Sequence, residues 1–332
     1  MRSAHLNPPP FIHQTGGSDP FDPKVSGWIL PWDGKEEMDV GFIGVPLSRS
    51  SISASAASEA PMAVRQSWRS FSTYDVDHDV DLFPLKVRDL GDIRMHVTDI
   101  SLCHRHIEQG MKDVYEATAR FPDFLPVIMG GDHSITCPSV KSFAQFHSGK
   151  KIGLLQFDTH FDVRSLESGG PSNGTPIRGL IESGTIQGEN IVQIGIHGFA
   201  NAAVYRRYVD EQGIVFFTMR EVRSRGLSAI MEEAVSRLKE KVDLIYVTVD
   251  IDVLDLSFLP GSPGPSPGGM FSWEMFEAVH RLGKEEQVKA LDLVCLDPFR
   301  DVAGVSVKTA MHTILSFLSG VCLRRRGVED SL

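Results

Sequence analysis

The amino-acid sequence predicts an α/β protein with a mostly parallel sheet of about eight strands. Short apolar runs of the kind that form buried strands alternate along the chain with longer segments of helical periodicity. Such alternation favours parallel strands connected by helices that cover both faces of one sheet. Several apolar runs also end directly in Asp or His, which places polar side chains at the carboxyl edge of that sheet.

The predicted elements follow one another in a regular order from residue 38 onwards. A strand at 38–45 leads into a Ser-rich loop at 48–53 and a helix that begins near residue 60, and a strand at 87–92 precedes a helix at about 100–121. Later strands are expected at 126–130, 152–158, 190–196, 214–218, 243–250 and 288–296, and later helices at about 137–147, 201–212, 226–240, from residue 272, and at about 303–320.

The chain is expected to form a single domain at residues 38–325, because neither an internal repeat nor a long linker interrupts this order. Residues 1–37 contain Pro8-Pro9-Pro10 and Gly16-Gly17, which discourage regular structure. We therefore expect a loosely structured N-terminal arm at 1–37.

The composition is that of a soluble globular protein. Of the 332 residues, 42% are hydrophobic and 23% are charged, and the formal net charge of -10 argues against nucleic acid or an anionic membrane as a partner. No apolar run approaches the ~20 residues that a membrane-spanning helix needs, and the polar start of the chain lacks the apolar core of a signal peptide. The cysteines lack CxxC spacing, so we expect reduced thiols and a cytoplasmic protein.

Three of the apolar runs end in residue types that bind divalent cations. Side chains alternate faces along an extended segment, so alternate positions after a strand can converge on one site. Converging carboxylates repel one another and need a cation nearby. For a single Asp, capping a turn is the commoner role, but three such strand ends together favour metal binding. The candidate ligands are His133 in the segment 130–134, Asp158, His160 and Asp162 after the run 154–157, and Asp250 and Asp252 after the run 244–249.

The ligand types also select the metal. Two imidazoles and four carboxylates, without a thiolate, suit hard or borderline ions such as Mn²⁺. A Cys-rich set would instead indicate structural zinc.

The three ligand-bearing motifs resemble those of the ureohydrolases, the arginase and agmatinase superfamily. The resemblance extends over nearly the whole chain from about Asp39, and it implies a three-layer α/β/α sandwich with residues 38–325 as an arginase-like catalytic domain. It also implies two Mn²⁺ per chain, one held by His133, Asp158, Asp162 and Asp250, and the other by His160, Asp158, Asp250 and Asp252. The motifs are Gly130-Gly131-Asp132-His133-Ser134, Asp158-Thr159-His160-Phe161-Asp162 and Asp250-Ile251-Asp252-Val253-Leu254-Asp255.

The resemblance implies hydrolysis at an amidine or guanidine carbon. Divalent metals depress the pKa of water and so supply a nucleophile at neutral pH. By position, Asp162 is expected to relay a proton to the leaving nitrogen, and Glu274 to pair with the cationic group of the substrate. The alternative for Glu274 is a solvated carboxylate at a helix N-terminus.

Segments near the expected substrate pocket distinguish branches of this superfamily. Agmatinases and arginases carry His where this chain has Asn173, and the Glu that agmatinases carry is missing from the segment 263–269. The segments 44–53 and 169–178 instead resemble the branch that hydrolyses N-formimino-L-glutamate to L-glutamate and formamide, a reaction of histidine catabolism.

Three arginines on the expected loops suit a substrate with two carboxylates. A guanidinium group can bind a carboxylate through two parallel hydrogen bonds, whereas it would repel the distal ammonium of agmatine. We expect at least one of the three to be an ordinary surface residue. The candidate substrate-binding residues are Arg49, Arg164, Asn173, Arg178 and Glu274.

Two other functions fit the same motifs. An agmatinase or guanidino-acid hydrolase would release urea, and an inactive protein of the same fold would act as a metal-stabilised binding subunit. All six ligand positions are intact, which argues against the inactive protein. The expected partner is a small amidine or guanidine, and the resemblance implies a homo-oligomer. His78, in the carboxylate-rich segment 75–81, could attract a cation, although a solvated surface loop is the commoner outcome.

Overall fold

The computed structural model describes residues 3–10, 19 and 21–327, and within them ten strands form one sheet. The strand order is β1-β6-β3-β7-β12-β11-β8-β9-β10, and β2 also pairs with β6. From β6 to β10 every neighbouring pair is parallel, which confirms the predicted parallel sheet of about eight strands. The parallel strands are β3 (Val40–Val45), β6 (Val87–Ile93), β7 (Leu125–Gly130), β8 (Ile152–Phe157), β9 (Ile191–Ile196), β10 (Val215–Thr218), β11 (Leu244–Asp250) and β12 (Val288–Val294).

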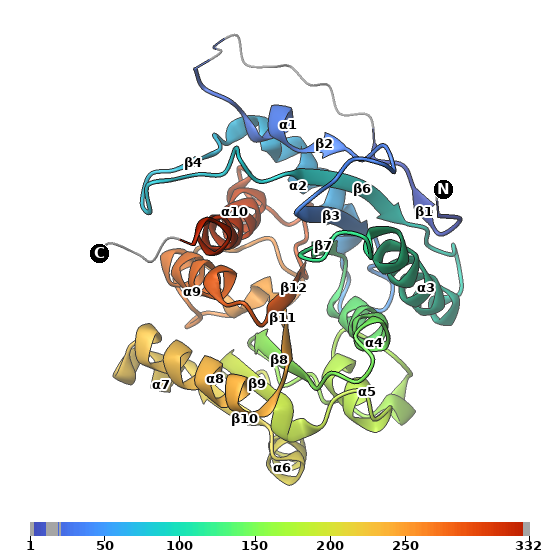
Figure 1. The fold of residues 1–332 in the computed structure, drawn as a ribbon. Coiled ribbons are helices and arrows are strands. Elements are labelled where there is room, and N and C mark those ends of the chain that lie inside the picture. The colour runs from blue at the N-terminus through green and yellow to red at the C-terminus, as the bar shows by residue number, and fades with distance from the viewer. Residues whose placement is uncertain (1–2, 11–18, 20, 328–332) are drawn as a thin grey trace.

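Helices cover both faces of this sheet, so the chain forms a three-layer α/β/α sandwich (Figure 1). One helical layer consists of α2 (Ala60–Ser67), α7 (Met219–Arg225), α8 (Leu227–Lys241), α9 (Ser272–Lys284) and α10 (Val305–Arg326). The other consists of α3 (Ile100–Thr118), α4 (Thr136–Phe146), α5 (Pro176–Glu182) and α6 (Ala203–Gln212).

The strands are apolar on both sides because each side packs against a different helical layer. In β11, Ile245, Val247 and Val249 belong to the core beneath α8, α9 and α10, whereas Tyr246 belongs to the core beneath α3 and α4. Every one of these side chains is fully buried. Burial on both faces explains why the strand appears in the sequence as a continuous apolar run.

The described part of segment 1–37 packs against the same sheet. It contains β1 (Leu6–Asn7), α1 (Val25–Trp28) and β2 (Leu30–Pro31), and both short strands pair with β6. Val25 and Trp28 are at most 5% exposed, and the Trp28 indole donates a hydrogen bond to the Leu85 carbonyl at 2.9 Å. The domain boundary near residue 37 stays a prediction, and Gly16-Gly17 lies outside the described residues.

The sequence-based prediction also omits two short helices and a short hairpin after residue 38. The helix α5 begins at Pro176, and α7 begins with a capping box between Thr218 and Glu221 directly after β10. Strands β4 (Tyr74–Asp75) and β5 (Val80–Asp81) form a separate antiparallel hairpin. Each is too short to show the hydrophobic periodicity on which the prediction relies.

Helix α10 is long and apolar enough to cross a membrane by length and composition alone. In the folded chain, 72% of its most apolar stretch is buried inside the protein. It packs along α9 and α2 as a core helix.

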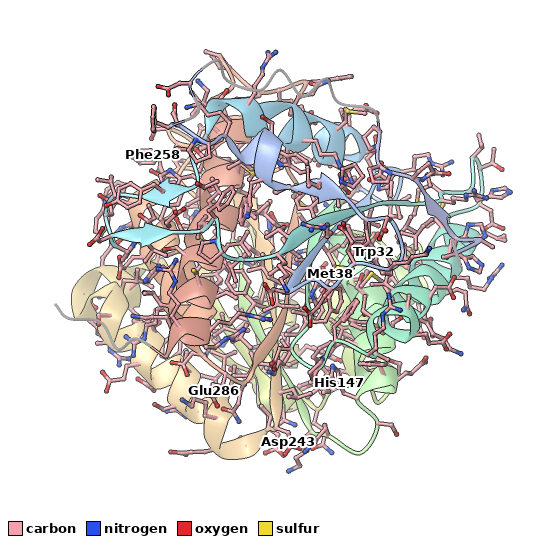
Figure 2. All side chains as sticks on the ribbon, turned by 45° about the horizontal axis from the view of Figure 1, so that its top comes forward. Trp32, Met38, His147, Asp243, Phe258 and Glu286 are labelled. Carbon is pink, nitrogen blue, oxygen red and sulfur yellow. The ribbon has the colours of Figure 1, made fainter. Side chains whose placement is uncertain are left out.

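The strands that carry the candidate ligands end at the same edge of the sheet. In Figure 2, His147, Asp243 and Glu286, which precede β8, β11 and β12, lie at the lower side of the view. Because these strands are parallel, their carboxyl ends lie at the opposite edge. Ligand sites of open parallel sheets are found at that edge.

Candidate metal centre and substrate cavity

Three candidate ligands from two other strand ends converge on His133. Its Nδ1 atom lies 3.1 Å from Asp158 Oδ2, 2.7 Å from Asp162 Oδ2 and 3.2 Å from Asp250 Oδ2. His133 and Asp158 are fully buried, and Asp162 and Asp250 are nearly so. One atom from each side chain therefore faces the same small volume.

A second group of ligands lies beside the first and shares Asp158 with it. His160 Nδ1 is 3.3 Å from Asp158 Oδ1 and 3.2 Å from Asp252 Oδ2. Asp158 thus directs one carboxylate oxygen to each imidazole. This is the arrangement that two neighbouring cations with a shared carboxylate require.

The residues fit a metal because two of the facing atoms have no hydrogen-bond partner within the described chain. His133 Nδ1 and Asp162 Oδ2 are buried and form no hydrogen bond, although they lie 2.7 Å apart. The other ring nitrogen of His133, Nε2, lies 3.0 Å from the Thr248 hydroxyl and has a partner. A buried polar atom without a partner is costly, and a divalent cation would satisfy both atoms.

Local backbone structure aims the carboxylates. The Asp158 carboxylate accepts a hydrogen bond from the His160 backbone N–H, and the Asp250 carboxylate accepts one from the Asp252 N–H. Asp162 has a left-handed backbone conformation, with φ of 55°, which is uncommon for a residue other than glycine. Strain of this kind is found at functional sites, where the surrounding fold maintains it.

A buried polar network holds His133 in place from behind. The Thr248 hydroxyl lies 3.0 Å from His133 Nε2 and 3.3 Å from the Thr136 hydroxyl. Thr136 in turn donates to Asp292 Oδ2 at 2.9 Å, and the Tyr246 hydroxyl donates to the same oxygen at 2.9 Å. Such partners fix the orientation of a ligating imidazole ring.

A second network supports the shared carboxylate. Gln156 donates to Asp158 Oδ2 at 2.6 Å, and Gln193 donates to Gln156 Oε1 at 2.7 Å. The Thr159 hydroxyl donates to the backbone carbonyl of Asp252 at 2.8 Å, so the Thr at this motif position is bonded to backbone.

These supporting residues are absent from the sequence-based predictions, although the sequence contains a signal for them. Gln156 and Gln193 are each the single polar residue of an otherwise apolar strand, and Thr248 and Asp292 each lie between two apolar residues in β11 and β12. Gln156 and Thr248 also precede a ligand by two positions, and Thr248 pairs directly with Asp292 across the sheet. An isolated polar residue two positions before a ligand is on the same face as that ligand.

The charges of the cluster are strongly coupled. Burial, and then the neighbouring charge of Asp158, raises the pKa of Asp162 to about 7. Burial and the charges of Asp252 and Asp158 raise the pKa of Asp250 to about 7. Burial opposes the charge on His160, but Asp252 and Asp158 raise its pKa to about 12. The fold therefore draws protons into this site when no other cation neutralises the carboxylates.

Four of the six ligands line a cavity of about 120 Å³. His160, Asp162, Asp250 and Asp252 contribute to its wall, and Cys295, which also has a positive φ of 64°, is beside them. The predicted residues Arg164 and Asn173 line the same cavity.

A larger cavity of about 750 Å³ adjoins the first and contains the predicted arginines. Arg49, Arg164 and Arg178 all line it, and Arg164 lines both cavities. Ile52 and Tyr205 are also shared by the two walls. The structure thus places a cationic mouth outside an anionic pocket.

The three arginines differ in how they are held. Arg49 donates to the His96 carbonyl, and Arg178 is paired with Glu182 at 2.6 Å and stacks on Tyr208 at 4.5 Å. The Arg164 guanidinium lies 5.6 Å from the centre of the Tyr205 ring. Arg164 is therefore the arginine whose position between the two cavities best suits a substrate contact.

The pocket loop that contains Ser50 and Ile52 is joined by hydrogen bonds to the loop that contains Asn173. Asn173 Oδ1 accepts a hydrogen bond from the Ile52 N–H at 2.9 Å, and the Asn173 N–H donates to the Ser50 carbonyl at 3.1 Å. The Ser50 N–H donates to the buried Asp132 carboxylate at 3.1 Å. At Gly131 an added Cβ would lie 1.7 Å from the Leu47 carbonyl oxygen, so only glycine allows the first loop to approach β7 this closely.

Glu274 is the one predicted substrate-binding residue that lines neither cavity. Its carboxylate accepts a hydrogen bond from the Phe271 N–H at 2.8 Å and caps the first turn of α9. This is the contact expected of a first-turn carboxylate. A direct role of Glu274 in substrate binding stays a prediction.

The fold and this metal centre define a class of protein. The sequence model of the Arginase family matches residues 38–320, and the chain belongs to that family. Within the family it is similar to formimidoylglutamases. It is 47% identical to the formimidoylglutamase of Halalkalibacterium halodurans over 304 residues, which are 92% of this chain and 94% of the relative.

Solved structures of formimidoylglutamases are also similar to this chain. The crystal structure of formimidoylglutamase from Bacillus subtilis superposes with a TM-score of 0.88 at 38% identity, over 95% of this chain and 97% of that one. A variant of the Trypanosoma cruzi formiminoglutamase with bound Mn²⁺ superposes with a TM-score of 0.82 at 25% identity, over 92% and 99% of the two chains. The predicted family resemblance is confirmed.

Proposed function

We propose that this protein hydrolyses N-formimino-L-glutamate to L-glutamate and formamide. The observation that carries the proposal is an arginine-lined cavity that adjoins a buried His and Asp cluster. An amidinium group suits the anionic pocket, and the two carboxylates of the same substrate suit the cationic mouth. The similarity to formimidoylglutamases supports this substrate over a guanidine.

The metal centre would hold two Mn²⁺ ions. His133, Asp158, Asp162 and Asp250 would ligate one, and His160, Asp158, Asp250 and Asp252 the other. Oxygen-rich ligands with two imidazoles suit this ion, and the T. cruzi relative binds Mn²⁺. When bound, such a pair of ions lowers the pKa of water and supplies a nucleophile at neutral pH.

The bond changes balance as a simple hydrolysis. Water adds to the amidine carbon, the bond from that carbon to the glutamate nitrogen breaks, and the oxygen of water becomes the formamide oxygen. Asp162, which lines the inner cavity, would accept the proton of the attacking water and pass it to the leaving glutamate nitrogen.

The remaining predicted residues would orient the substrate. Arg164 would bind a carboxylate at the boundary between the two cavities, and Arg49 and Arg178 would provide positive charge around the mouth. Asn173 would act through its bond to Ile52, which keeps the two pocket loops together. Glu274 would reach the substrate only if its side chain left the cap of α9.

Three further properties complete the proposal. The enzyme would act in the cytoplasm, in histidine catabolism, as a homo-oligomer. The first follows from the cysteine pattern, the second from the proposed substrate, and the third from the family resemblance.

The test is a product analysis on the Mn²⁺-loaded protein with formiminoglutamate, agmatine, arginine and guanidinobutyrate. We expect formamide and glutamate from the first substrate and little urea from the others. A higher kcat/KM for urea release from agmatine or guanidinobutyrate would favour a ureohydrolase of a different branch. No product from any substrate, with full metal content, would favour an inactive binding protein.

A further inference from the structure

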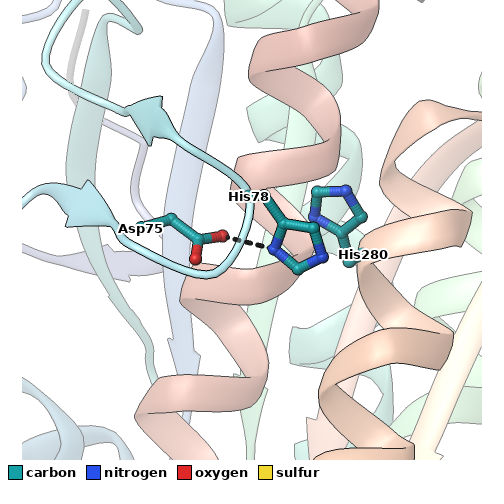
Figure 3. Close-up of side chains that lie close together, drawn as sticks. All are labelled: Asp75, His78 and His280. Atoms are coloured by element: carbon teal, nitrogen blue, oxygen red, sulfur yellow. Dashed lines mark hydrogen bonds and ion pairs between the residues drawn. The ribbon is translucent and has the colours of Figure 1, made fainter. Parts of the chain in front are cut away.

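A second cluster of potential metal ligands lies outside the candidate active site, where the β4–β5 hairpin packs on helix α9. Figure 3 shows its members: Asp75 at the end of β4, His78 in the hairpin turn, and His280 on α9. One possible ligand atom from each of the three lies within 4.8 Å of the others.

The contacts in this cluster place carboxylates on both sides of His78. Its Nδ1 atom lies 2.9 Å from Asp75 Oδ2, and its Nε2 atom lies 3.5 Å from Glu277 Oε2. Glu277 and His280 are three residues apart on α9, and Asp75 and His78 are three residues apart in the hairpin. Two carboxylate–histidine pairs with the same spacing thus face each other from distant parts of the chain.

The buried side chain of His280 provides an independent indication that this cluster binds an ion. It is 1% exposed, and neither of its ring nitrogens has a hydrogen-bond partner in the described residues. At least one ring nitrogen of an imidazole carries a proton, so a buried ring without partners is costly. Its ring is aimed at the hairpin, because it stacks on the His78 ring at 3.5 Å with an interplanar angle of 8°.

We propose that Asp75, His78, Glu277 and His280 form a binding site for a divalent cation of the Zn²⁺ type. Imidazole and carboxylate groups both ligate this ion, and four such side chains complete its usual four-coordinate shell. The active-site ligands are richer in oxygen, so the two sites differ in the metal that they prefer.

Binding requires a small rearrangement of the hairpin side. In stacked rings the in-plane lone pairs are parallel and do not converge on one point. His280 is fixed in the core by α9, whereas His78 is on a surface turn, so His78 is the ring that turns. The bound ion would then fasten the β4–β5 hairpin to α9.

The test compares total bound metal in the wild type and in variants of this cluster. Each protein is dialysed to equilibrium against Mn²⁺ and Zn²⁺, and both metals are counted per chain by elemental analysis. We expect His78→Phe, which keeps an aromatic ring on His280 but removes the ligand, to bind one metal equivalent fewer than the wild type. Glu277 is exposed, so Glu277→Gln leaves the fold intact and should weaken Zn²⁺ binding by about tenfold or more.

The control is His106→Phe, since His106 also makes a ring contact, with His5 at 6.0 Å, but is on α3. The control and both cluster variants should retain the Mn²⁺ and the hydrolase activity of the wild type. Added Zn²⁺ should also raise the melting temperature of the wild type more than that of His78→Phe. Equal total metal in wild type and His78→Phe would overturn the proposal, and it would do so whatever the substrate of the active site is.

Discussion

The anionic pocket and the cationic mouth are neighbours, but the protein builds them in different ways. The pocket ligands are at strand ends, are almost fully buried except for His160, which is one-third exposed, and are aimed by backbone hydrogen bonds and polar networks. The arginines of the mouth are on loops and on the short helix α5, are partly or largely exposed, and have other partners nearby. The difference implies that the sheet fixes the bond chemistry and that the loops select the substrate.

The largest effect should come from the carboxylate shared by both ligand groups. Asp158→Asn keeps the size of the side chain but removes the charge that faces His133 and His160. We expect loss of both metals and of nearly all activity, well beyond the roughly 10- to 100-fold cost of disturbing an outer-shell partner. Elemental analysis and kcat measure this directly. His133→Asn is the comparison, because it should mainly weaken one of the two ions.

A smaller effect should follow from a change behind the pocket. Thr248→Val keeps the shape of the side chain but leaves His133 Nε2 without its partner. Metal affinity should fall by about 10- to 100-fold. The control is Thr313→Val, because Thr313 is also fully buried but bonds to the Thr309 carbonyl on α10. If the two valine variants bound metal equally well, the network behind His133 would have no role in metal binding.

A change of pH should affect the pocket through competition between protons and metal. The pKa values of Asp162 and Asp250, about 7, and of His160, about 12, are raised above their ordinary values. Such groups stabilise the fold at low pH, and this stabilisation is lost as pH rises from their unfolded values through their folded values. Without metal the protein should therefore lose stability as pH rises from about 5 to 8.

Metal replaces those protons, so the gain in melting temperature on adding Mn²⁺ should increase over the same interval. Thermal unfolding with Mn²⁺ and with a chelator, measured across this range, provides the test. A gain in melting temperature that decreased as pH rose would contradict this prediction.

The smallest effects should come from the two arginines that are held by other groups. Arg178→Ala and Arg49→Ala remove charge from the mouth, but their side chains are engaged by Glu182 and the His96 carbonyl. We expect each to lower kcat/KM for formiminoglutamate less than Arg164→Ala does, with metal content unchanged. Steady-state kinetics of the three variants give the order, and a larger loss for Arg178→Ala than for Arg164→Ala would reverse our assignment.

The sequence alone predicts the ligands of the anionic pocket, because the pattern that marks them lies within short segments of the chain. A buried strand produces an apolar run, and ligands at alternate positions after it share a face, as Asp158, His160 and Asp162 do. The same reasoning predicts seven of the eight parallel strands from their apolar runs, whereas β6 contains Arg88, Asp89 and Asp92 and is less apolar.

The mouth could not be predicted in the same detail because its contacts join residues that are far apart in the chain. Which of Arg49, Arg164 and Arg178 is free to bind a substrate depends on partners such as Glu182 and Tyr205. The clustering of His78 with His280 is likewise a tertiary contact that neither local segment reveals.

The division of roles between pocket and mouth is tested most directly by two substrates and one variant. The measurement is kcat/KM of the wild type and of Arg164→Ala for formiminoglutamate and for a simple formamidine without carboxylates. We expect Arg164→Ala to lower the value for formiminoglutamate by about 10- to 100-fold, the equivalent of a lost charge-assisted contact of about 1.5–3 kcal/mol, with partial recovery in Arg164→Lys. Arg164→Ala should leave kcat/KM for the formamidine unchanged. The control is Arg206→Ala, on α6, whose arginine pairs with Asp210, and it should leave this value unchanged as well. An equal loss for both substrates would contradict the account, because Arg164 would then act on the reacting carbon and not on the substrate carboxylates.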